Sequence, residues 1–172
     1  MRMGSKKIAL QISLIAVFTA LIAVTTLAVR IPVPATGGYI NIGDAMIFIA
    51  ALSFGGTIGG LAGGLGSAIA DMIGYPLFAP FTLIIKGLEG FIAGKIADGA
   101  SAKRDVLAWG AGSTIMVIGY FITEAYVMRL GTPSALIEVP GNSFQVIFGG
   151  MIGLPISRLI RRRIQNFLRS QM

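Results

Sequence analysis

Long apolar runs, separated by short polar breaks, dominate the pattern of residues along the chain. The six runs cover residues 8–29, 42–54, 57–73, 81–97, 106–128 and 144–160. A helix needs about 20 residues to cross a bilayer, so the second run is short. We expect it to borrow residues from Pro34–Asn41 or to begin inside a cavity below the membrane surface. The pattern predicts an all-α membrane protein, a bundle of six transmembrane helices forming a single domain over residues 1–172.

The breaks between the runs carry glycine and proline, which favour turns. They fall at Pro32 and Pro34 and at residues 55–56, 74–76, 98–99, 131–133 and 140–141. The last two breaks predict a loop between the fifth and sixth runs. This prediction places Glu138 in that loop, outside the spans.

Composition supports lipid as the solvent. Mean hydropathy is +0.83 and 12% of residues are charged, about half the share in a soluble domain. The chain has no cysteine and no histidine. Disulfides and thiolate chemistry are therefore excluded, and the commonest general base and metal ligand is absent. We expect neither a bound metal nor an organic cofactor.

Basic residues flank the apolar runs and gather on one side of the predicted bundle, which argues against a nucleic-acid partner despite the net charge of +7. Eleven of the 14 lysines and arginines fall at the N-terminus, in the connection after the fourth run, and in the tail. The positive-inside rule therefore predicts that both termini are cytoplasmic. The first run is longer than a signal-peptide core and lacks a suitable cleavage site, so we expect a retained helix.

Small residues recur every four positions in the third run, at residues 55, 59, 63 and 67 and, beside them, at 56, 60, 64 and 68. Such spacing lets helix backbones approach closely within a membrane. Asp71 continues the first series, so its side chain is expected to face the bundle and not the lipid.

Five ionisable residues lie within the spans, where each charge is costly without a partner or a function. These are Asp44, Asp71, Lys86, Glu89 and Glu124. The predicted topology puts all five in the outer half of the membrane, together with Tyr120, Asn142 and Gln145. Either they form an ion-pair network that only positions helices, or they line an outward-facing pocket. Four acids against one base favour the pocket, because a ligand rich in hydrogen-bond donors would complete it.

The chain has no G-x-x-x-x-G-K-[ST] phosphate loop, so we expect that it is not an enzyme and does not hydrolyse ATP itself. Transport would then need a separate motor or an ion gradient. A stand-alone transporter that carries protons on Asp44, Asp71 or Glu124 is one alternative. An intramembrane enzyme is a further alternative, disfavoured because no nucleophile and base pair is apparent.

Several stretches resemble the S components of energy-coupling factor (ECF) vitamin importers, in their riboflavin-type branch. They are GYINIGD at 38–44, AIAD at 68–71, GYP at 74–76 and APFTLIIKGLEG at 79–90. The resemblance implies a substrate-capturing subunit that works with a transmembrane scaffold protein and two cytoplasmic ATPase subunits. It also implies scaffold docking through an A-x-x-x-A pattern, matched by Ala16 and Ala20, and a gating loop at residues 30–40.

We therefore expect a subunit that captures riboflavin or a related pyrimidine or pyridine compound for an ATP-driven importer in the cell membrane. The candidate substrate-binding residues are Asn41, Asp44, Asp71, Lys86, Glu89, Tyr120, Glu124, Asn142 and Gln145.

Overall fold

The computed structural model describes residues 2–97, 99 and 101–170 and is built of helices with one small hairpin. The helices are α1 (Arg2–Ala28), α2 (Asp44–Phe54), α3 (Gly56–Gly74), α4 (Ala79–Ile96), α5 (Ala102–Ile122) with its π-helical extension η1 (Thr123–Val127), and α6 (Thr132–Ser170). The strands β1 (Ile31–Val33) and β2 (Gly38–Ile40) pair antiparallel.

The helices correspond to the six apolar runs, which confirms the all-α prediction apart from the hairpin. Three segments in the described part of the chain are long and apolar enough to cross a membrane, namely Lys6–Ala28, Ala102–Val127 and Thr132–Asn166. As the apolar pattern indicated, α2 is short, with 11 residues. It begins at Asp44 inside the protein.

The predicted loop around Glu138 is wrong, because α6 runs without interruption from Thr132 and contains Pro140 and Pro155. Proline has a backbone φ compatible with a helix, and in the interior it removes one hydrogen bond and crowds the preceding turn. Helix α6 continues through both prolines despite that cost. The extra N-terminal turns carry Glu138 into the protein interior, where its side chain is 4% exposed.

The α3–α4 contact is the closest helix packing in the bundle, and it depends on the small residues of α3. Gly59 faces the backbone of Gly90, and Gly56 faces that of Gly94, without room for a β-carbon on either α4 glycine. This arrangement confirms the role predicted for the four-residue spacing. Leu61 and Leu65 of α3 are exposed and line a groove along the α3–α4 contact, which suits contact with lipid.

Gly90→Ala should destabilise the bundle by about 1–3 kcal/mol, because the added methyl group would overlap the Gly59 carbonyl oxygen and force α3 and α4 apart. Gly87→Ala, three residues earlier on α4, is the matched control, since its nearest new contact would be an ordinary 3.6 Å to the Gly60 oxygen. Thermal unfolding in detergent measures both. Equal stabilities of the two variants would contradict the idea that close approach of α3 and α4 at Gly90 limits this interface, because helix propensity alone favours alanine at both positions.

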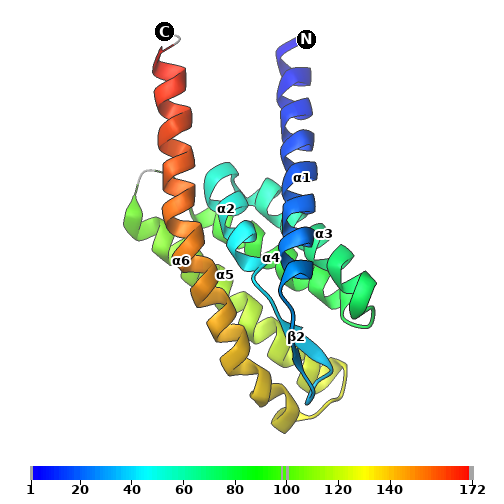
Figure 1. Ribbon diagram of the computed structural model, residues 1–172. Helices are drawn as coiled ribbons and strands as arrows, with labels where there is room; N and C mark the ends of the chain where they lie inside the picture. The colour runs from blue at the N-terminus through cyan, green and yellow to red at the C-terminus, as the bar shows by residue number, and fades with distance from the viewer. Residues whose placement is uncertain (1, 98, 100, 171–172) are drawn as a thin grey trace.

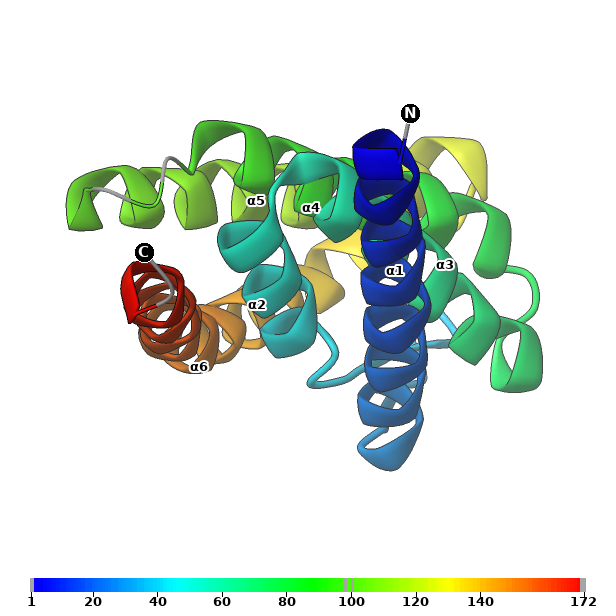
Figure 2. The same ribbon diagram turned by 90° about the horizontal axis from the view of Figure 1, so that it is seen from above.

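Helix α2 lies at the centre of the molecule, between α6 on one side and α1 on the other (Figure 2). Eight of its residues are buried, among them Ile47 and Phe48, which belong to two separate apolar clusters. Both chain termini lie at one end of the molecule, and the hairpin lies toward the opposite end (Figure 1). Termini at the same end are what an even number of membrane crossings would produce.

Candidate functional site

The centre of the site is Lys86, a fully interior lysine on α4. Its Nζ atom pairs with the carboxylate of Asp44 and lies 3.1 Å from Oε2 of Glu89. All three side chains are at most 2% exposed. One cation therefore faces two carboxylates in a medium where an isolated charge is very costly.

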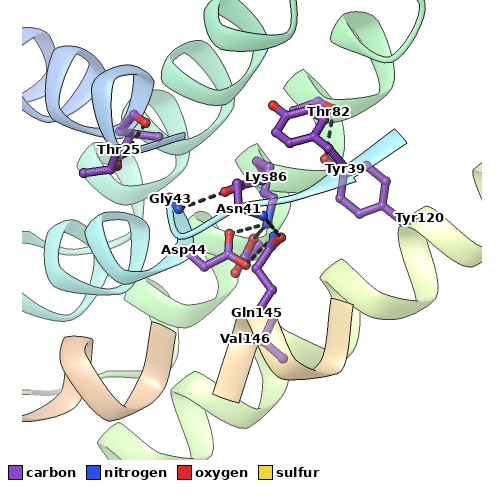
Figure 3. A network of polar contacts seen from close by, with 12 residues as sticks. Thr25, Tyr39, Asn41, Gly43, Asp44, Thr82, Lys86, Tyr120, Gln145 and Val146 are labelled. Carbon is purple, nitrogen blue, oxygen red and sulfur yellow. Dashed lines mark hydrogen bonds and ion pairs between the residues drawn. The ribbon is translucent and has the colours of Figure 1, made fainter. Parts of the chain in front are cut away.

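Gln145 joins this cluster to the start of α2. Its Nε2 donates to Oδ2 of Asp44 at 2.9 Å, and its Oε1 accepts from the Asn41 backbone N–H at 2.7 Å. The Asn41 side-chain oxygen accepts from the Gly43 N–H at 2.8 Å. Figure 3 shows Asp44, Lys86 and Gln145 pointing toward one another. These bonds satisfy polar backbone just before α2, which allows the helix to begin inside the protein.

A second polar group surrounds Asp71, on the last turns of α3. The Tyr39 hydroxyl of the hairpin donates to its carboxylate. Burial and the nearby Asp71 charge raise the pKa of Tyr39 above its ordinary value, which keeps the phenol protonated as a donor. Beside it, the hydroxyls of Thr82 and Tyr120 lie 2.9 Å apart, and Lys86 Nζ lies 5.7 Å from the centre of the Tyr120 ring.

Arg30, the residue just before β1, holds the base of the hairpin in place. Its guanidinium lies 4.9 Å from the centre of the Tyr39 ring and 5.4 Å from that of Tyr75, and these rings stack 4.3 Å apart. Arg30 also donates to the backbone oxygen of Ala70 at 2.5 Å. The hairpin is thus held against the end of α3.

Two glutamates form the acidic wall of the site. Glu124 lies in the π-helical turn η1 and is fully buried, and neither of its carboxyl oxygens has a hydrogen-bond partner among the described residues. The Glu138 carboxyl of α6 lies beside it and accepts a hydrogen bond from Thr36 of the hairpin. Glu124 therefore meets another acid, and it has acceptor capacity left that a ligand can use.

These groups line one cavity that is partly open to the outside, and the empty space in it and at its mouth is about 380 Å³. It is a narrow cleft, and little of it is wide enough for a water molecule. Its lining residues are Thr26, Gly38, Tyr39, Asn41, Ser67, Asp71, Phe78, Thr82, Lys86, Tyr120, Glu124, Glu138, Asn142 and Gln145. Such a surface can bind a small polar ring through hydrogen bonds and stacking.

The structure brings most of the predicted site residues to this cavity. Seven of the nine line it: Asn41, Asp71, Lys86, Tyr120, Glu124, Asn142 and Gln145. Asp44 and Glu89 lie behind the cavity surface, where they pair with Lys86. The network and the pocket, considered as alternatives from the sequence, therefore adjoin one another.

Several lining residues were missed by the sequence reasoning. Thr82 could have been found, because it lies one helical turn before Lys86 and shares its face. Glu138 was hidden by the loop wrongly predicted at Pro140 and Gly141. Thr26 gave no signal, since a threonine in an apolar helix is as often a packing residue.

An apolar helix bundle that surrounds a polar, acid-rich cavity under a hairpin has the architecture of a membrane protein that holds a small molecule. The resemblance seen in the sequence is confirmed, since residues 6–162 match the family described as ECF-type riboflavin transporter, S component. The chain belongs to this family and is accordingly a multi-pass membrane protein of vitamin-type transport.

Two relatives extend over nearly the whole chain. An uncharacterized protein of Pyrococcus woesei is 44% identical over 148 residues, covering 86% of this chain and 99% of its own length. The thiamine precursor transporter HmpT of Lactococcus lactis subsp. cremoris is 29% identical over 164 residues, covering 94% of each chain.

Proposed function

We propose that this protein is the substrate-capturing subunit of an ATP-driven ECF-type importer and that its cavity binds a vitamin or vitamin precursor. The observation that carries the proposal is the buried Glu124 carboxyl, which in the described structure meets only a second acid, Glu138. An unpaired buried acid costs stability, and a ligand with N–H donors would satisfy it.

The acidic wall and the hydroxyl groups near it also indicate the class of ligand. Riboflavin and related pyrimidine or pyridine compounds all present a flat ring with polar edges, which suits the hydroxyls of Tyr39, Thr82 and Tyr120 as well as the acids. The name of the Lactococcus relative, a thiamine precursor transporter, points the same way.

Docking and topology complete the proposal. We take all six helices as transmembrane, in a single domain with both termini in the cytoplasm and the hairpin outside. Ala16 and Ala20 are exposed on α1, so no described element of this chain covers the pair. In the proposal they form the flat surface on which the scaffold protein packs, and the scaffold carries the two ATPase subunits.

A ligand screen tests this function. Purified protein should show a higher unfolding temperature with a thiamine precursor, riboflavin or pyridoxine, because a ligand that binds only the folded state stabilises it. At about 100 times the dissociation constant the gain is ~2.7 kcal/mol. No response to any of these rings would contradict the substrate class. Uptake into vesicles that lack ATPase subunits would contradict the ATP-driven assignment and favour a gradient-driven transporter.

A further inference from the structure

A second polar pocket lies between the start of α5 and the C-terminal half of α6. These two segments lie away from the hairpin (Figure 1). The buried carboxylate of Asp105 is its anchor. Arg161 binds both oxygens of this carboxylate, and Arg158 Nε lies 3.3 Å from one of them. The lining residues are Gly99, Ser101, Ala102, Asp105, Arg158, Arg161, Arg162 and Gln165.

The pocket has more positive charge and more donors than its own acid can satisfy. Three arginines and one acid, Asp105, line the pocket, and two of the arginines pair with that acid. Arg161 also donates to the Leu52 backbone oxygen at 2.6 Å, yet its buried Nε atom has no hydrogen-bond partner among the described residues. An anionic acceptor would satisfy the arginine donors that Asp105 leaves unused, and phosphate oxygens match the geometry of these donors.

The exposed side chains of α5 and α6 indicate which kind of molecule would supply the phosphate. Outside the pocket, both helices carry exposed apolar side chains, with Leu107 62% and Leu159 55% exposed. These side chains suit acyl chains, which would place the arginines at headgroup level. The empty space is about 500 Å³ and opens outward.

We infer that this pocket binds the phosphate of an anionic phospholipid headgroup. Basic pockets between transmembrane helices on the cytoplasmic side recognise such headgroups. The bound lipid would hold α5 and α6 together beside α2, through the same arginines that pair with Asp105. This site is separate from the substrate cavity and does not depend on the function proposed for it.

The test uses the full chain in detergent, with native mass spectrometry to measure binding of phosphatidylglycerol and phosphatidylcholine. Arg162→Gln removes a pocket charge that takes no part in the pairs with Asp105. It should weaken phosphatidylglycerol binding about fivefold, since a basic residue near an anionic lipid contributes about 1 kcal/mol. Arg163→Gln is the matched control, because Arg163 is exposed and outside the pocket.

Retained affinity in Arg163→Gln with loss in Arg162→Gln would support the site. Equal affinities in the two variants would overturn it, because both lose the same net charge. A second arm adds inorganic phosphate alone. If phosphate displaced phosphatidylglycerol at micromolar concentration, or if the two lipids bound equally, the pocket would be a site for a free anion and the lipid assignment would be wrong.

Discussion

Replacing Glu124 with glutamine should remove most of the affinity for substrate and leave the ligand-free protein at least as stable. The loss is expected to be about 10- to 100-fold, because a buried ligand donor left without its acceptor costs roughly 1–3 kcal/mol. Stability should hold or rise, since the neutral amide ends the burial of an unpartnered acid beside Glu138. Calorimetry with the ligand found in the screen gives the affinity, and thermal unfolding gives the stability.

Tyr126→Phe is the control for Glu124→Gln. Tyr126 belongs to the same π-helical turn, but its side chain is 63% exposed. Substrate affinity should therefore not change in this variant. A Glu124→Gln protein that binds normally would contradict the assignment of the acidic wall, and one that loses both stability and binding would show that Glu124 acts as a structural residue.

Removing the charge of Lys86 should have the largest effect on folding. In Lys86→Met, Asp44 and Glu89 remain buried without a cation, and breaking a buried pair in this way costs about 3–5 kcal/mol. Lys95→Met provides the comparison, because Lys95 lies on the same helix with an exposed side chain. That change should stay within about 0.5 kcal/mol. Unfolding in detergent measures both variants, and similar stabilities would mean that the buried pairs do not hold the bundle together.

The helices of this protein could be predicted because lipid imposes a simple rule, that a spanning segment must be apolar for most of its length. The convergence of Asp71, Lys86 and Gln145 followed from the same rule, since polar groups in a membrane gather away from lipid. Chain breaks were harder to judge. Pro140 and Gly141 have the composition of a turn, and only the packing of α6 against α2 and η1 shows that the helix continues through them.

The sequence also could not predict how deeply each side chain lies within the site. Spacing placed Lys86 and Glu89 on one face of α4, but it could not show which of them reaches the cavity. That depends on how far Asp44 and Gln145 approach from α2 and α6, and Asp44 binds both Lys86 and Gln145. The hairpin was equally hidden, because its few residues pair only where Gly37 adopts a positive φ of 71°.

The hairpin is held by the same polar groups that line the cavity. Tyr39 depends on Asp71, Thr36 depends on Glu138, and the Asn41 backbone depends on Gln145. A molecule that enters and uses any of these partners must alter the restraint on the hairpin, and thermodynamic linkage makes the influence mutual. We expect the residence time of the occupant and the opening rate of residues 31–40 to change together. Substitutions far from the occupant, at Arg30 for instance, would then tune how long it stays.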